Sequence, residues 1–257
     1  MGEPMPQRSA RPELTAGEKT LVVLEEALNA ARFSDIVSTT GLAKATVHRI
    51  LATLIDRGFV VLSDEMEYIP GPKFLSIAAQ AFDRVDVSAA VEPIVRELAE
   101  KTHCTVHVGV RNGDEMIYLV RMDSDRPYQM PSRKGQSVGM HCSGMGKAVL
   151  SKLSDEGIVE LISRAGMPRR TARTITTVAQ MKREIQQARC DGFTHDREEN
   201  VPGVICIAAP VNDYTRQWPY AVSISTLALE HTEEDLIAMA PDLISTAKAM
   251  SKLLGSA

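Results

Sequence analysis

The sequence predicts an α+β protein that contains an N-terminal winged helix-turn-helix and a larger C-terminal domain with an antiparallel sheet. Three observations support this fold class. Helical apolar spacing fills residues 15–58, two short strand-like runs follow Gly58, and strand and helix patterns are mixed after Asp86. With 257 residues, the chain is long for one domain and comfortable for two.

The composition is that of an ordinary soluble protein. Hydrophobic residues make up 44% of the chain and charged residues 24%. No apolar run approaches the roughly 18 residues that a membrane-spanning helix needs, and residues 1–15 lack the apolar core of a secretory signal. The 4 cysteines are scattered without a disulfide rhythm, which favours reduced thiols. We therefore expect a cytoplasmic protein with no membrane association.

Two helices are predicted near the start of the chain, after a disordered arm over residues 1–14. Thr15 and Glu18 form a capping-box pattern, and an amphipathic helix follows them. Ser34 is placed to cap a shorter second helix. Gly41 ends that helix, because glycine readily adopts the left-handed conformation at a helix end.

A third helix is predicted to begin near Lys44 and to end at Gly58. Its apolar residues recur at helical spacing: Val47, Ile50, Leu51, Leu54 and Ile55. The following run "FVVLSDEMEYIP" is typical of two short strands around a polar turn. This order of elements, with a tight turn at Gly41, is that of a winged helix-turn-helix over residues 15–70.

In such a unit the second helix of the pair enters the major groove of DNA. The face of the third helix opposite its apolar stripe carries the candidate DNA-binding residues: Lys44, Ala45, Thr46, His48, Arg49 and Thr53. Since the net charge of the chain is −4, binding must depend on a local basic patch. The alternative is the solvated face of an ordinary helical bundle; the Gly41 turn and the hairpin favour DNA binding.

The predicted winged helix-turn-helix ends after the hairpin, and a linker helix and a larger domain follow it. Pro70 and Pro72 interrupt the strands, and Pro72 suits the first turn of a linker helix over residues 71–85. Residues 86–257 form the larger domain. Its strands are predicted in "CTVHVGV", "EMIYLVRM", "GVICIAAPV" and "YAVSIST", with a hairpin turn at 112–114. Helices are predicted at 144–152, 155–164 and 178–190, and a C-terminal helix is kinked by Pro241 or begins there.

Two sets of side chains could suggest metal or catalytic chemistry. A metal site could use His103, Cys104, His107, His141 and Cys142. A nucleophile and its base could be Cys142 or Cys206 with His195. No C-x-x-C pair exists, and no spacing demands a catalytic pair. Buried or surface residues explain these positions better. We expect no metal, no cofactor and no catalytic residues.

A binding turn is the preferred interpretation of "SGMGKA". Ser143 suits the N-cap of a helix that begins at Gly144, and free N–H groups there would favour an anion. The alternative is a glycine-rich turn that simply packs. Ser223 and Ser225 lie two apart on one strand and so face one side.

A basic cluster, Arg164, Arg169, Arg170 and Arg173, could contact DNA or an acidic partner, but a solvated loop is favoured.

The segments "FSDIVSTTGLAKATVHRILATLIDRGFV" and "YIPGPKFLSIA" resemble the N-terminal domain of IclR-type transcriptional regulators. "GMHCSGMGKAVLS" and "GFTHDREENVPGVICIAAPV" resemble the signature stretches of the effector-binding domain of that family, which has a GAF-like sheet. The resemblance covers almost the whole chain after the arm, and the long proline-containing arm is a departure from it. It implies a recognition helix with Lys44, Thr46, His48 and Arg49. It also implies an effector cavity lined by Met130, Ser143, Gly144, Met145, Asp196, Cys206, Ser223 and Ser225.

The sequence therefore predicts a ligand-responsive transcriptional regulator of a catabolic operon, either repressor or activator. It would bind double-stranded operator DNA as a homodimer or tetramer and sense a small carboxylic or sugar acid. Asp196, taken as an anion at a loop entrance, would accept a hydrogen bond from a ligand hydroxyl. One alternative is an enzyme that acts on a small acid through Cys206 or Asp196, and another is a protein-interaction module.

Overall fold

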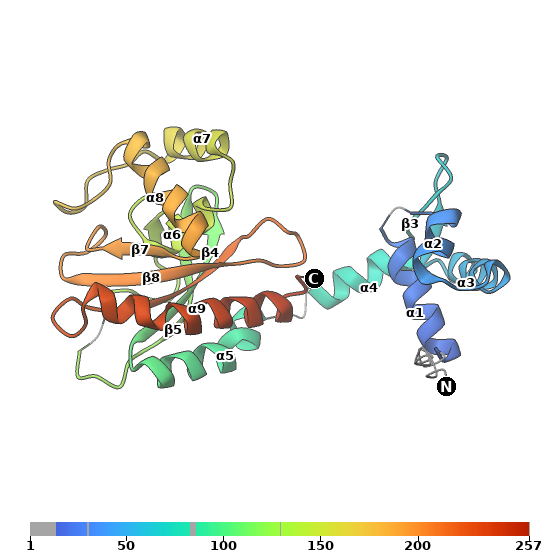
Figure 1. Ribbon diagram of the computed structural model, residues 1–257, viewed down its shortest axis with the longest axis horizontal. Helices are drawn as coiled ribbons and strands as arrows, with labels where there is room; N and C mark the ends of the chain where they lie inside the picture. The colour runs from blue at the N-terminus through green and yellow to red at the C-terminus, as the bar shows by residue number, and fades with distance from the viewer. Residues whose placement is uncertain (1–13, 30, 83–85, 129, 257) are drawn as a thin grey trace, which may run out of the picture. The chain divides into compact units, whose positions relative to one another are not determined.

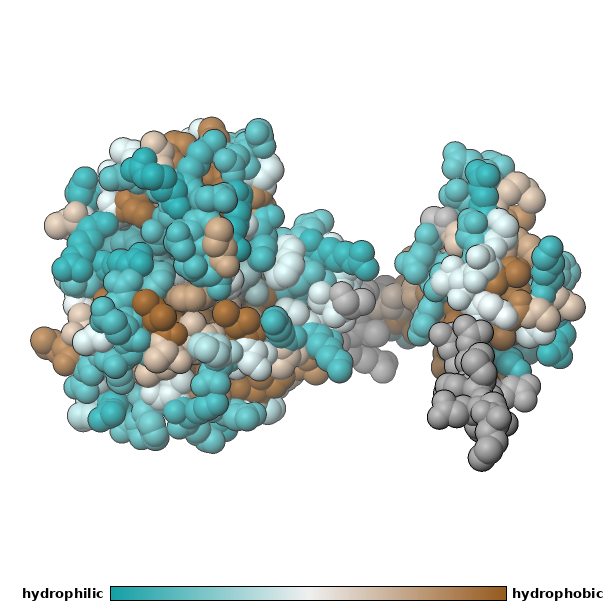
Figure 2. All heavy atoms as spheres, in the orientation of Figure 1, coloured by the Kyte–Doolittle hydropathy of each residue, from teal (hydrophilic) through white to brown (hydrophobic). Residues whose placement is uncertain are grey.

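The computed structural model describes residues 14–29, 31–82, 86–128 and 130–256. The chain divides into two compact units, Met1–Val85 and Asp86–Ala257 (Figure 1). Residues 1–13 of the predicted disordered arm lie outside the described residues. Hydrophilic residues cover most of the visible face of each unit, with hydrophobic patches between them (Figure 2). No helix in the described part of the chain is long and apolar enough to cross a membrane.

Unit 1 is a winged helix-turn-helix. Its helices are α1 (Ala16–Ala27), α2 (Phe33–Thr40) and α3 (Lys44–Asp56), and its strands are β1 (Ala31–Arg32), β2 (Val60–Leu62) and β3 (Glu67–Pro70). The three strands form an antiparallel sheet in the order β1-β3-β2. The predicted capping box starts α1, since the Thr15 hydroxyl accepts from the Glu18 N–H and Glu18 Oε2 accepts from the Thr15 N–H.

The ends of the short helices differ in part from the prediction. Gly41 follows α2 with a φ of 66°, the left-handed conformation that was expected there. The start of α2 was predicted wrongly: it begins at Phe33, and the carboxylate of Asp35 accepts from the Arg32 N–H at 3.2 Å. Ser34 is therefore inside the helix. Asp35 caps it because its carboxylate satisfies an N–H that the helix itself leaves without a partner.

The linker helix α4 (Pro72–Phe82) starts directly from the wing. Its first turn is tied to the chain after α3, because Lys73 N–H donates to the Gly58 carbonyl and Gly71 N–H donates to that of Phe59, both at 2.9 Å. A Cβ atom at residue 71 would lie 2.4 Å from the Gly58 carbonyl oxygen. Only glycine allows this close approach of two backbone segments.

Unit 2 contains a six-stranded antiparallel sheet in the order β6-β5-β4-β9-β8-β7. The strands are β4 (Thr105–Asn112), β5 (Glu115–Met122), β6 (Ser137–Gly139), β7 (Thr194–Arg197), β8 (Val204–Val211) and β9 (Tyr220–Leu227). The predicted hairpin between β4 and β5 is present, with Gly113 at a φ of 61°. The edge strands β6 and β7 were not predicted, and Asp196 lies within β7 rather than at a loop entrance.

Helices cover both faces of this sheet (Figure 1). They are α5 (Val87–Thr102), α6 (Gly144–Leu150), α7 (Asp155–Ala165), α8 (Val178–Asp191) and α9 (Glu233–Leu253). One hydrophobic core joins α5 and α9 to the sheet residues Val108, Ile207 and Ile224, and a second joins α6, α7 and α8 to the other face. Helix α9 contains Pro241 within it and begins earlier, where Thr232 and Asp235 form a capping box.

Strand alternation separates the two faces chemically. On β9, Val222 and Ile224 enter the core beneath α5 and α9, while Ser223 and Ser225 face the side that α6 covers. On β8, Cys206 lies opposite Ser225 in the register and also faces α6. The polar residues of the sheet are therefore gathered on the α6 side.

Candidate DNA-binding helix and ligand cavity

Helix α3 presents one apolar and one polar face. Val47, Ile50, Leu51 and Leu54 are buried, whereas Ile55, predicted to be apolar and inward, is exposed. The candidate DNA-binding residues occupy the other face: Lys44, Ala45, His48, Arg49 and Thr53 are exposed, and Thr46 is half-buried. The structure thus brings all six to one surface of α3.

Two contacts order the side chains on this surface. The His48 ring packs edge-on against Phe33 of α2, with ring centroids 6.3 Å apart. The Thr53 hydroxyl donates to the Arg49 carbonyl at 3.0 Å, which keeps that hydroxyl close to the helix. The Arg49 guanidinium makes no ion pair with any described residue. An exposed arginine beside a histidine and threonines can meet phosphates or base edges.

Unit 2 contains a cavity of about 170 Å³ between the sheet and α6. All eight candidate effector residues line it: Met130, Ser143, Gly144, Met145, Asp196, Cys206, Ser223 and Ser225. Sequence reasoning missed other lining residues, among them His107, Tyr118, Ser132, Gln136, Arg170 and Asn200. His107 could have been found by the same alternation that selected Ser223 and Ser225, because it faces the same side of the neighbouring strand β4.

His107 links the floor of the cavity to the segment above it. Its Nε2 lies 2.7 Å from the Ser132 hydroxyl and its Nδ1 lies 3.4 Å from the Ser225 hydroxyl. Burial, reinforced by the nearby positive charge of Arg121, lowers the pKa of His107 to about 3. The imidazole is therefore neutral at physiological pH, so one ring nitrogen donates and the other accepts.

The start of α6 has the predicted N-cap and packs closely against the sheet. Ser143 is the N-cap as expected, and its hydroxyl accepts from the Gly146 N–H at 3.1 Å and donates to the Gly139 carbonyl at 2.8 Å. A Cβ atom on Gly144 would lie 2.8 Å from Cys206 Sγ, so the helix packs directly on β8. The Gly146 N–H is therefore occupied by the cap, and anion binding by the other N–H groups at this helix start stays a prediction.

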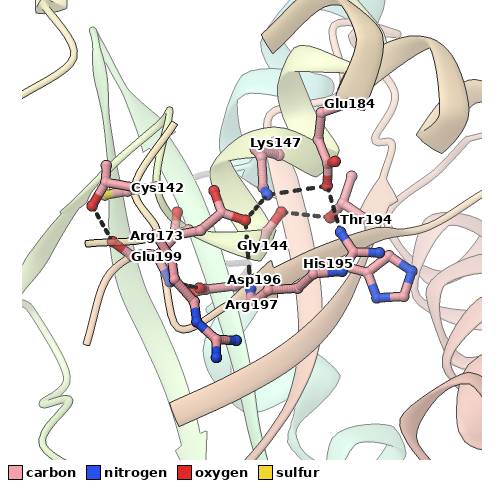
Figure 3. Close-up of polar contacts among 12 residues, drawn as sticks. Cys142, Gly144, Lys147, Arg173, Glu184, Thr194, His195, Asp196, Arg197 and Glu199 are labelled. Atoms are coloured by element: carbon pink, nitrogen blue, oxygen red, sulfur yellow. Dashed lines mark hydrogen bonds and ion pairs between the residues drawn. The ribbon is translucent and has the colours of Figure 1, made fainter. Parts of the chain in front are cut away.

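A buried ion pair lies next to residues that line the cavity (Figure 3). Lys147 of α6 is 0% exposed, and its Nζ lies 2.5 Å from Glu199 Oε1 and 3.2 Å from Glu184 Oε1. The backbone N–H of Glu199 donates to Asp196 Oδ1 at 2.7 Å. Two carboxylates therefore share the Lys147 ammonium, and Asp196 is joined to them through the backbone of Glu199.

Asp196 is not the simple anion that the sequence suggested. It is 5% exposed. Burial raises its pKa to about 7, against the opposing effect of the positive charge on Lys147. The negative charge of Glu199 raises the pKa of Asp196 further, whereas the hydrogen bond from the Glu199 N–H opposes the rise. At neutral pH a large fraction of Asp196 is protonated and can donate a hydrogen bond.

No group of three or more His, Cys, Asp or Glu side chains in the described part of the chain could hold a metal ion. His103 Nδ1 contacts Asp125, whereas His141 Nε2 contacts the Pro168 carbonyl. Burial raises the pKa of the Cys206 thiol strongly, which leaves it protonated and a poor nucleophile. The four arginines of the basic cluster are all exposed, as the preferred solvated-loop prediction expects, and of the four only Arg170 lines the cavity.

A helix-turn-helix with an exposed polar recognition helix, joined to a unit with an internal cavity, defines a ligand-binding transcriptional regulator. The family description "Bacterial transcriptional regulator IclR C-terminal" matches residues 79–252, and "IclR helix-turn-helix domain" matches residues 21–63. The chain therefore belongs to the IclR family of bacterial transcriptional regulators, which confirms the resemblance. The family consists of regulators rather than enzymes.

Individual relatives match over almost the whole chain. The HTH-type transcriptional repressor AllR of Salmonella typhimurium is 30% identical over 254 residues, or 98% of this chain and 93% of that protein. The transcriptional repressor IclR of Escherichia coli is 29% identical over 245 residues, or 94% of this chain and 89% of that protein. The crystal structure of Thermotoga maritima IclR shares the fold, with a TM-score of 0.64 at 24% identity, covering 92% of this chain and 97% of that chain.

The raised pKa of Asp196 predicts a pH-dependent effect of Asp196→Asn on stability. A carboxyl group whose pKa is higher in the folded state stabilises the fold at low pH and loses that contribution as pH rises through about 7. The wild type should therefore lose stability relative to Asp196→Asn between about pH 4 and about pH 8, by roughly 2–4 kcal/mol. Urea unfolding at several pH values measures this difference. A constant difference across the range would show that Asp196 is an ordinary ionised carboxylate.

Proposed function

We propose that the chain is a repressor whose DNA binding is controlled by a small organic acid bound in the cavity of unit 2. The observation that carries this proposal is the convergence of eight residues, from separate segments between Met130 and Ser225, on one cavity. The repressor role is supported by the names of the relatives AllR and IclR.

The chemistry of the cavity favours a small, oxygen-rich ligand. Among the described residues, five serine hydroxyls and two side-chain amides line it: Ser132, Ser137, Ser143, Ser223, Ser225, Gln136 and Asn200. The neutral His107 and a protonated Asp196 add further donors. The side chains of Met130, Met145 and Tyr118 supply apolar contact and limit the size of the ligand. A hydroxy- or keto-acid of a catabolic pathway fits this combination better than a lipid or a cation.

Operator recognition would require more than one copy of the chain. A single helix-turn-helix reads a short half-site, and specificity in such proteins comes from paired half-sites held by an oligomer. We therefore expect a homodimer or a tetramer on a near-palindromic operator, with Lys44, Thr46 and Arg49 of each α3 in the major groove.

The recognition helix can be tested with Arg49→Ala. Arg49 is exposed and lies opposite the buried stripe of α3, so the variant should fold normally. Loss of an arginine contact to a guanine should weaken operator binding by roughly 1–3 kcal/mol. Fluorescence anisotropy with operator DNA measures this, and Arg183→Ala on the exposed surface of α8 is the matched control. Equal affinity for Arg49→Ala and the wild type would remove α3 from the interface.

The regulatory proposal predicts that a small acid releases the operator. A thermal-shift screen of hydroxy-, keto- and sugar acids should find compounds that raise the melting temperature, because a ligand that binds only the folded state stabilises it. The same compounds should lower operator affinity in anisotropy measurements, while their uncharged amides should not. Acids that bind tightly but leave operator affinity unchanged would contradict the proposed control of DNA binding.

A further inference from the structure

Arg170 stands out among the residues that line the cavity. Of these residues, all within the described part of the chain, it is the only lysine or arginine. Its side chain is exposed while it also borders the cavity, which places it at the mouth. His107 is neutral because its pKa is about 3, so it supplies no positive charge to the interior.

Arg170 belongs to residues 166–177, which we call the strap. Hydrogen bonds hold the backbone of this segment at the mouth of the cavity. The Thr171 hydroxyl donates to the Glu198 carbonyl and the Thr174 hydroxyl to the Glu199 carbonyl, both at 2.7 Å. The Arg170 N–H in turn donates to the Thr174 hydroxyl at 3.0 Å. The strap is thus fastened to the same loop that carries the partner of Lys147.

The other three arginines of the basic cluster already have partners. Arg164 pairs with Asp114 and Glu160, and Arg173 pairs with Glu198. Arg169 donates to the Ala172 carbonyl. The Arg170 side chain makes no hydrogen bond or ion pair with any described residue. A positive charge without a partner, at the opening of a polar cavity, is a ready site for an anion.

The positive charge of Arg170 influences the pKa values of two partly or fully buried groups, Cys142 and His141. Burial raises the pKa of the Cys142 thiol to about 11, and the positive charge of Arg170 opposes this rise. Burial lowers the pKa of His141, and Arg170 lowers it further. Of the described residues that line the cavity, Asp196 is the one with a carboxyl group, and it forms no ion pair with Arg170.

We propose that Arg170 is the anion anchor of the cavity and binds the carboxylate of a small acid at the mouth. The ligand then lies with its carboxylate beside Arg170 and its hydroxyl or keto oxygen toward Ser223, Ser225 and His107. The planar guanidinium can hold both carboxylate oxygens at once, which a lysine ammonium cannot do. This assignment rests on the proposed function, because it names the charge that selects acids at the same site.

Glycolate and glycolamide are suitable probes, since they differ mainly in charge. Their binding to the full chain is measured by ligand-observed NMR titration, for the wild type, Arg170→Gln, Arg170→Lys and Arg169→Gln. The wild type should prefer glycolate over glycolamide by about tenfold or more, as expected for a charge-assisted hydrogen bond. Arg170→Gln should remove the preference, and Arg170→Lys should restore part of it. Arg169→Gln, which alters the neighbouring exposed arginine, should behave as the wild type does.

A glycolate preference that survives in Arg170→Gln would overturn the assignment. The proposed function would then stand if acids from the screen still released the operator from that variant. Failure of the wild type to bind glycolate at millimolar concentration, or equal binding of the two probes, would also overturn the anchor. If no acid of the wider screen bound either, the proposed function would fall with it.

Discussion

The burial of the Lys147 ammonium group is the constraint on which the cavity depends. All seven residues of α6 are buried, so a lysine in this helix cannot reach water. An unpaired charge in that position would cost several kcal/mol. Its partner Glu199 lies 52 residues later in the chain, in the loop after β7, at 2.5 Å. The pair therefore holds this loop over α6, where Asn200 and Val201 become part of the cavity wall.

Other features follow from the position of that loop. The N–H of Glu199 orients the carboxyl group of Asp196, and its carbonyl accepts from Thr174 of the strap. The strap then sets Arg170 at the mouth. Burial raises the pKa of Glu199 against the opposing charge of Lys147, and Glu199 Oε2 has no hydrogen-bond partner among the described residues. The pair therefore lies in a setting that disfavours the charged carboxylate of Glu199, beside the cavity that we propose binds an anion.

Much of the fold could be predicted from periodicity and from glycine and proline. The helices α1 to α3 and the β4–β5 hairpin follow from such local patterns, and strand alternation placed Ser223 and Ser225 on one face. The edge strands β6 and β7 have three and four residues, too few to show alternation. The protonation of Asp196 depends on burial by elements distant in the sequence. The role of Lys147 depends on Glu199 and Glu184, which no local pattern connects to it. Arg170 lies in an exposed loop, as the sequence predicts, and only the tertiary fold brings it to the cavity.

The most direct test of this account is hydrogen exchange in Glu199→Gln. This variant keeps the shape of the side chain but removes the closer of the two carboxylates that pair with Lys147. Breaking a buried pair costs roughly 3–5 kcal/mol. The account predicts much faster exchange of amides in residues 198–203 and in the strap, with little change in α5 and α9. Lys101→Gln, which breaks the exposed pair with Asp242, should leave both regions as in the wild type. Unchanged exchange of the 198–203 loop and the strap in Glu199→Gln would contradict the claim that this ion pair holds the cavity wall in place.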